Sequence, residues 1–265
     1  MNPENPPLDH PLIYCNGDSY SDENYDLSLV GKTYAHVLAQ SVGGFAINHA
    51  LSGSCNRRIV RTTVHDVLNQ RQLNPTQQIV VLLGLSFELR SELWIDDIQN
   101  NIRPSESNFR AHQFSRQRNW HDNLLSDRDI ATDNFFQVNE KYLKKFSEGR
   151  AFFYSPYQER INLLTDLIML RAMFEQLDID FLIFQSPRAE KLESDYLLDF
   201  FKDQIAGDKR IMDFETFGFT DWCYEKKFTP IDMLDDPAIA HYGPDAHAAF
   251  AEQFLIPHLK SLQIL

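Results

Sequence analysis

The segment Gly17-Asp18-Ser19 follows directly after an apolar run, Leu12-Ile13-Tyr14-Cys15. A short apolar run that ends at Gly-Asp is typical of a buried strand that breaks into a loop. The glycine permits a sharp turn, so the serine is presented at the carboxyl end of the strand, where open α/β sheets bind ligands. Ser19 is therefore a candidate nucleophile. Asp18 is a candidate substrate contact or, alternatively, forms a side-chain turn that stabilises the loop.

Other predicted strand ends carry the groups that such a nucleophile needs. A short strand at 45–47 leads into Asn48-His49-Ala50-Leu51-Ser52-Gly53, and His241 stands shortly before an amphipathic C-terminal helix. A serine hydroxyl is a poor nucleophile unless an adjacent base accepts its proton, and histidine is the commonest base. Ser19 and His241 together therefore indicate nucleophilic catalysis, although an ordinary turn histidine is the alternative interpretation of His241.

This layout resembles the SGNH (GDSL-like) hydrolases, a family of esterases and acyl hydrolases on a flavodoxin-like three-layer α/β/α fold. The resemblance covers Ile13 to about Leu259, apart from a middle segment. It implies that Ser19 is the nucleophile, that His241 is the general base, and that the backbone N–H of Gly53 helps to bind the oxyanion.

Two positions depart from the family's pattern. Its third block usually reads Gly-x-Asn-Asp, and Ser86 stands where the Asn completes the oxyanion hole. Ser86 or Asn56 is expected to supply that donor. The family's Asp, three residues before the histidine, is replaced by Ala238. Asp235 and Asp236, slightly upstream, are the candidates for the carboxylate that orients the imidazole, and a backbone carbonyl is the weaker alternative.

The remaining elements alternate between strand and helix. Ile79–Leu83 is the clearest buried strand, and the pattern continues with a helix at 161–177, a strand at 180–184, a helical patch at 192–201 and a short strand at 210–213. Such alternation predicts a parallel sheet with right-handed crossovers. We expect one SGNH-like domain over residues 1–265: a three-layer α/β/α sandwich whose parallel sheet has about five strands.

The segment from about 95 to 150 does not fit this pattern. It is polar, with nine basic and nine acidic residues, and is too long for a plain loop in a compact domain. We expect a helical insertion that forms a lid over the site or an interface, with a solvated surface excursion as the alternative. Arg57, in the helix after Gly53, and Arg90, after the third strand, are candidate substrate-binding residues, unless they pair with acidic surface groups.

Composition narrows the class of partner. The formal net charge of −13 argues against nucleic acid or an anionic membrane as a partner. The three cysteines are widely spaced and imply no disulfide framework. The sequence contains no HExxH motif and no paired cysteines, so it predicts no metal site. The sequence has no glycine-rich phosphate loop after a strand, so it predicts no cofactor. The N-terminus lacks the apolar core of a signal peptide, and no apolar run is long enough to cross a bilayer, which predicts a cytoplasmic protein.

Together these features predict a serine hydrolase that cleaves a small-molecule or glycan ester, with an O-acetyl or other short acyl group. No cofactor is expected, and a homo-oligomer is left open. One alternative is a binding module on the same fold that has lost its chemistry, favoured by Ser86 and Ala238. The other is acyl transfer to a sugar or polymer hydroxyl at the same site.

Overall fold

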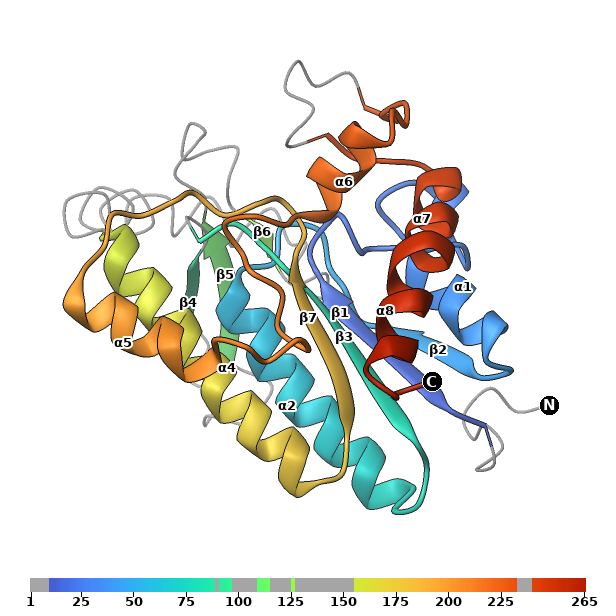
Figure 1. The fold of residues 1–265 in the computed structure, drawn as a ribbon, viewed down its shortest axis with the longest axis horizontal. Helices are drawn as coiled ribbons and strands as arrows, with labels where there is room; N and C mark the ends of the chain where they lie inside the picture. Colours follow the sequence, from blue (N-terminus) through green and yellow to red (C-terminus); the bar gives the residue numbers. More distant parts are fainter. Residues whose placement is uncertain (1–9, 89–90, 97–108, 115–124, 127–154, 233–239) are drawn as a thin grey trace.

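A four-stranded parallel sheet forms the centre of the computed structural model, which describes residues 10–88, 91–96, 109–114, 125–126, 155–232 and 240–265. Its strands lie in the order β2-β1-β3-β7 (Figure 1). Their bounds are Leu12–Gly17 for β1, Phe45–Asn48 for β2, Ile79–Leu85 for β3 and Asp180–Gln185 for β7. This order is the flavodoxin-like one, and because all pairs are parallel, the carboxyl ends of the strands share one edge.

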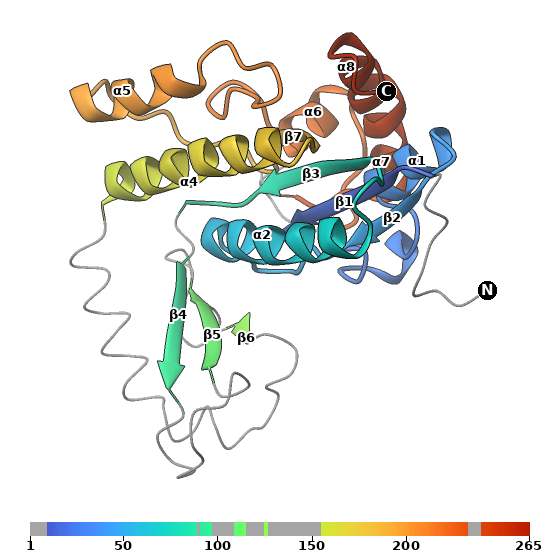
Figure 2. The same ribbon diagram turned by 90° about the horizontal axis from the view of Figure 1, so that it is seen from below.

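Side chains alternate between two buried faces along each strand, as a period of two requires. Ile13 and Cys15 pack with α1 (Tyr34–Ser41), α6 (Phe219–Glu225), α7 (Pro244–Phe250), the π-helical turn η6 (Ala251–Leu255) and α8 (Ile256–Ser261). Leu12 and Tyr14 pack with α2 (Asn56–Leu73), α4 (Pro156–Gln176) and α5 (Tyr196–Ile205). Helices therefore cover both faces of the sheet (Figure 2), and the predicted three-layer α/β/α sandwich is confirmed.

The predicted fifth strand is reduced to one residue, so the sheet has four strands rather than about five. Ile211 forms an isolated parallel bridge with Ile183 at the free edge of β7. Turns on both sides of Ile211 prevent further pairing. The Ile211 N–H donates to Asp208 O at 3.0 Å, and the Asp213 side chain accepts from Glu215 N at 2.9 Å. Aspartates favour such turns because their carboxylates bond nearby backbone N–H groups.

The described residues of the insertion are strands, so the predicted helical insertion is wrong for them. β4 (Ser91–Asp96), β5 (Phe109–Phe114) and β6 (Leu125–Ser126) form an antiparallel sheet in the order β4-β5-β6. Aromatic and β-branched residues in β4 and β5 favour pairing in a sheet over a helix. The rest of the segment from 95 to 150 lies outside the described residues, so its role as a lid or interface stays a prediction.

A buried ion pair joins the two ends of the insertion. Arg160, in the second turn of α4, is 1% exposed and bonds both carboxylate oxygens of Glu88, which lies just before β4. Its guanidinium also donates to Glu215 Oε1 at 3.1 Å. The ion pair therefore links the segment before the insertion, at Glu88, to the segment after it, at Arg160.

A second carboxylate ties the strands to α2. Asp66 accepts hydrogen bonds from Tyr14 Oη at 2.8 Å and binds Nδ1 of His49 at 2.6 Å and Nδ1 of His65 at 2.9 Å. Burial raises the pKa of Asp66, but the contacts with His49, His65 and Tyr14 outweigh it and lower the pKa to about 2.

Acid should therefore weaken the fold through Asp66. Its pKa is lower in the folded chain than the ordinary value of about 3.9, so its contribution is present above pH ~4 and is lost as the pH falls toward 2. We expect the urea midpoint of the wild type to fall more between pH 6 and pH 3 than that of Asp66→Asn. Equal falls in the two proteins would contradict the role of this carboxylate.

Two features bear on the class of protein. Cys15, Cys55 and Cys223 are buried and form no disulfide. None of the described helices is both long enough and apolar enough to cross a membrane.

Candidate active site

Ser19, His241 and Asp232 form a hydrogen-bonded chain at the carboxyl edge of the sheet. Ser19 lies in the turn after β1 and is 6% exposed, and His241 lies just before α7. Ser19 Oγ is 2.8 Å from Nε2 of His241, and Nδ1 of the same ring is 2.5 Å from Asp232 Oδ2. The backbone N–H of His241 also donates to Asp232 Oδ1 at 3.0 Å. A hydroxyl, an imidazole and a carboxylate are thus in contact, which is the arrangement that nucleophilic catalysis by serine uses.

Two paired glycines allow the Ser19 turn to pack closely on the sheet. Gly17 and Gly84 stand opposite each other at the ends of β1 and β3. A Cβ atom on Gly17 would lie 2.5 Å from Ser21 Oγ, and one on Gly84 would lie 2.6 Å from the same atom. A side chain at either position would displace the loop from the sheet. Glycine at both positions therefore permits the position that Ser19 occupies.

Asp232 is the carboxylate that the sequence analysis missed. An antiparallel bridge between Pro230 and Tyr242, with Ile231 N donating to His241 O at 2.9 Å, brings Asp232 beside His241 across nine residues of chain. The family pattern directs attention to three residues before the histidine, and only this pairing identifies the more distant Asp232. Asp235 and Asp236, the carboxylates expected from the sequence, lie outside the described residues.

The glycine loop lies next to the nucleophile loop. Gly53 has a φ of +81°, a conformation that favours glycine over residues with a side chain. Asp22, which is 1% exposed, accepts from the neighbouring Ser52 N at 2.9 Å and Ser52 Oγ at 2.7 Å. The backbone N–H groups of Ser19 and Gly53 donate to no other atom within the described part of the chain. They are therefore available to bind an oxyanion.

Ser86 and Asn56 instead bond each other and the first loop. Ser86 Oγ donates to Asp18 Oδ2 at 2.7 Å, and Ser86 N donates to Asn56 Oδ1 at 2.7 Å. Asn56 Nδ2 donates to Ser86 O at 3.0 Å. Buried polar groups satisfy one another in this way because an unpaired one is costly. This geometry differs from the expectation that Ser86 or Asn56 aims a side-chain donor at the oxyanion.

Two of the three candidate substrate contacts, Asp18 and Arg57, lie within the described residues. Asp18 is fully buried, and its carboxylate accepts hydrogen bonds from Ser86 Oγ and the backbone N–H of Tyr20. Arg57 is exposed on α2 and lines a narrow cleft with Asp166 of α4. Arg90 lies outside the described residues.

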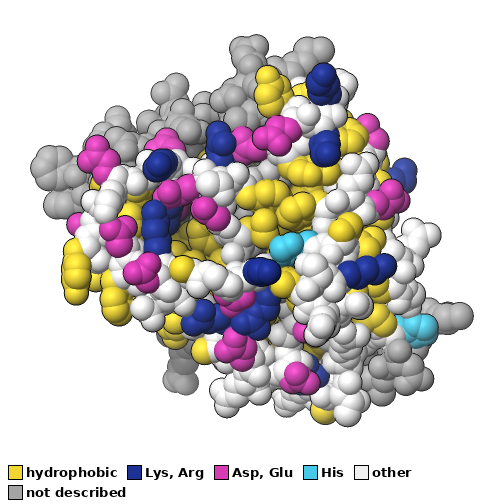
Figure 3. All heavy atoms as spheres, in the orientation of Figure 1, with side chains coloured by type: hydrophobic (Ala, Val, Ile, Leu, Met, Phe, Trp, Pro, Cys, Tyr) yellow, Lys and Arg dark blue, Asp and Glu magenta, His cyan; other side chains and the backbone are white. Residues whose placement is uncertain are grey.

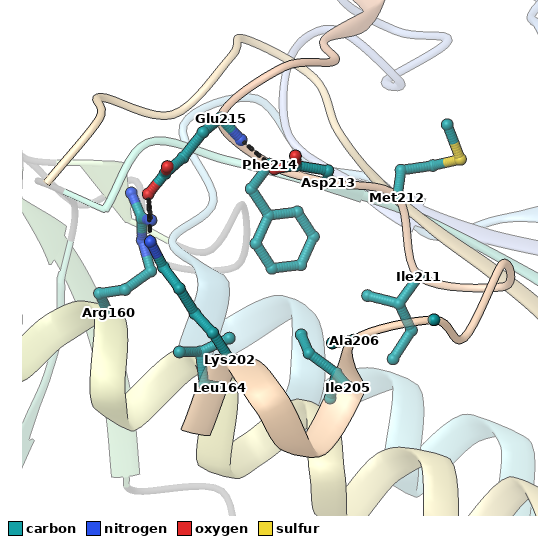
Figure 4. A pocket seen from close by; sticks show the side chains of 11 residues that line it. Arg160, Leu164, Lys202, Ile205, Ala206, Ile211, Met212, Asp213, Phe214 and Glu215 are labelled. Atoms are coloured by element: carbon teal, nitrogen blue, oxygen red, sulfur yellow. Dashed lines mark hydrogen bonds and ion pairs between the residues drawn. The ribbon is translucent and has the colours of Figure 1, made fainter. Parts of the chain in front are cut away.

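A separate cavity of about 380 Å³ lies between α4, α5 and the segment 205–215 (Figure 4). One end is charged, and there Glu215 Oε1 accepts from Lys202 Nζ at 2.7 Å and from Arg160 Nη1 at 3.1 Å. The rest is mainly apolar, with Leu164, Ile205, Ile211 and Phe214 in its wall. Its charged side chains neutralise one another, and none of the residues of the Ser19–His241–Asp232 chain lines it.

The distribution of charged groups bears on the partners and metal considered from the sequence. Acidic and basic side chains are interspersed on the face shown in Figure 3. This face therefore lacks the large patch of one sign that attracts a polyion. No group of three or more His, Cys, Asp or Glu residues in the described ranges is arranged to hold a metal ion.

No protein-family model matches the sequence, and the search of curated proteins gives no match. Several esterases are among the solved structures that resemble this chain. They include esterase EstA from Pseudoalteromonas sp., with 13% identity, a TM-score of 0.45 and coverage of 95% of this chain and 98% of that one. The acetyl xylan esterase AlAXEase has 10% identity, a TM-score of 0.44 and coverage of 93% and 98%. A catalytic mutant of Axe2, an acetylxylan esterase from Geobacillus stearothermophilus, has 17% identity, a TM-score of 0.41 and coverage of 94% of both chains.

Proposed function

We propose that this protein is a serine ester hydrolase of the SGNH type. The observation that carries the proposal is the continuous contact from Ser19 Oγ through the His241 ring to Asp232, at 2.8 Å and 2.5 Å. The motif residues Gly17-Asp18-Ser19, Gly53 and His241 that resemble the family support the same assignment. The proposed substrate is an ester of a short acyl group, such as an O-acetyl group on a small molecule or glycan.

The geometry supports a two-step reaction. Ser19 Oγ attacks the ester carbonyl carbon while its proton passes to Nε2 of His241, and the C=O electron pair moves onto the oxygen. The tetrahedral intermediate collapses, the bond to the alcohol breaks, and the imidazolium gives its proton to the leaving alkoxide. Water then attacks the acyl-serine with His241 again as base, which releases the acid and restores Ser19. Asp232 holds the ring tautomer and stabilises the imidazolium.

Backbone N–H groups bind the oxyanion in this mechanism. The N–H groups of Ser19 and Gly53 are the proposed donors, since they have no partner within the described part of the chain. Ser86 and Asn56 act indirectly, because their side chains brace Asp18 and the end of β3. The retained chain of hydrogen bonds favours a hydrolase over a binding module that has lost its chemistry.

Labelling with a small fluorophosphonate tests the proposal without knowledge of the substrate. We expect stoichiometric modification of Ser19, mapped by mass spectrometry, and its loss in Ser19→Ala and His241→Ala, both with a wild-type melting temperature. Absence of labelling in the folded wild type, or labelling that survives His241→Ala unchanged, would contradict a serine activated by this histidine. Turnover of short-chain esters with and without an alcohol acceptor then separates hydrolysis from acyl transfer.

A further inference from the structure

Two tyrosine rings cover the two faces of the His241 imidazole. The ring of Tyr20 stacks on it with centroids 4.5 Å apart and an interplanar angle of 11°. The ring of Tyr25 stacks on it at 3.8 Å and 18°. The two tyrosines differ in setting, because Tyr20 is 3% exposed within the core cluster whereas Tyr25 is 38% exposed.

Tyr25 also reaches the carboxylate of the same chain of contacts. Its hydroxyl donates to Asp232 Oδ2 at 3.4 Å, the oxygen that Nδ1 of His241 contacts. Its backbone is held from the nucleophile loop, since Tyr25 N donates to Asp22 O at 3.2 Å. Tyr25 therefore touches the base and its orienting carboxylate from a loop that begins at the nucleophile.

We propose that Tyr25 is a positioning residue whose ring holds the His241 imidazole in line with Ser19 and stabilises its protonated form. The expected effect of Tyr25 on the rate of Ser19 modification rests on the proposed function. The faces of an aromatic ring carry negative charge density, and a cation over such a face is stabilised electrostatically. His241 becomes a cation when it accepts the Ser19 proton, so a tyrosine on its face favours the state that forms during attack.

The other titratable groups described near His241 do not oppose its protonation. Asp232 of its own loop contacts Nδ1, and the Tyr20 and Tyr25 rings stack from the loop after β1. From α7, the buried His247 also interacts with His241. Burial, with a smaller effect from His241, lowers the pKa of His247 to about 3, so it stays neutral at working pH. Asp232 and the two rings are therefore described groups that favour the imidazolium.

The test compares Tyr25→Leu with Tyr25→Phe. Leucine keeps an apolar side chain over the imidazole but has no π face, and phenylalanine keeps the ring but loses the hydroxyl that bonds Asp232. Tyr25 lies outside the described core clusters, so both variants should fold, which their melting temperatures check. Two quantities are measured: the fluorophosphonate labelling rate across pH 5–9, and the His241 pKa from ¹⁵N NMR titration, assigned by comparison with His241→Ala.

We expect Tyr25→Leu to lower the pKa of His241 by about half a unit to one unit and the labelling rate by about 3- to 10-fold. Tyr25→Phe should stay within about twofold of the wild type. Equal pKa values in the leucine and phenylalanine variants would overturn the role of the ring. A loss in Tyr25→Phe as large as in Tyr25→Leu would also overturn it, because the hydroxyl would then be the active feature. If the wild type itself is not labelled, the proposed function fails, and the NMR titration alone decides the role of Tyr25.

Discussion

Replacing Asp232 with asparagine is expected to lower kcat by about four orders of magnitude while leaving the fold intact. The Asp232 carboxylate contacts Nδ1 of His241 at 2.5 Å and accepts the backbone N–H of the same residue at 3.0 Å. An asparagine fits the same space, but its amide can donate to Nδ1, which favours the tautomer with the proton on Nε2. That tautomer cannot accept the Ser19 proton, so the nucleophile loses its base. Single-turnover acylation of the variant, with circular dichroism as a check on folding, measures the effect.

Asp235→Asn and Asp236→Asn are the matched controls for this prediction. Both residues are close in sequence to Asp232, and both are the carboxylates expected from the sequence, slightly upstream of the family's position at Ala238. We expect each control to retain acylation within a few-fold of the wild type. A collapse of the rate in Asp236→Asn together with a mild effect in Asp232→Asn would show that the histidine is oriented from further along the chain.

Replacing Arg160 with alanine is expected to lower the free energy of unfolding by about 3–5 kcal/mol, the usual cost of breaking a buried ion pair by removing one partner. The Arg160 side chain is 1% exposed, and its loss leaves the Glu88 carboxylate without its cation, whereas Glu215 keeps its ion pair with Lys202 at 2.7 Å. Burial raises the pKa of Glu88, and the contact with Arg160 offsets that rise only in part. Without Arg160 the pKa of Glu88 must rise further, so the deficit should widen as the pH increases from 5 to 8.

Urea unfolding at several pH values measures this deficit, and Arg188→Ala is its control. Arg188 pairs with Asp221 at 3.6 Å, but its side chain is 52% exposed, so the variant should lose less than about 1 kcal/mol. Arg160→Met combined with Glu88→Gln and Glu215→Gln should recover part of the lost stability, because no charge is then left buried without a partner. A deficit in Arg160→Ala that is independent of pH would contradict the argument from the stranded Glu88 carboxylate.

Local patterns in the sequence were sufficient to predict the layered fold and to nominate two residues of the candidate site. The apolar runs of β1, β3 and β7 are buried over nearly their whole length, so their hydrophobicity identifies them without knowledge of their neighbours. Ser19 and His241 each stand at the end of such an element or just before a helix. The position of a residue directly after a strand or before a helix is a local property, so it can be read from the sequence alone.

Pairings between distant segments were decided only by the tertiary structure. Asp232 meets His241 because residues 230 and 242 pair in an antiparallel bridge, and a carboxylate in a loop gives no local indication of such a partner. The stacking of Tyr25 on His241 likewise joins parts of the chain more than two hundred residues apart. The turns around Ile211 limit its pairing with β7 to one bridge, and the hydrogen bond from Ser86 Oγ to the buried Asp18 is likewise visible only in the tertiary structure. Hydrogen-bond partners and ring contacts depend on which segments the fold brings together, whereas burial of a strand depends mainly on the residues within it.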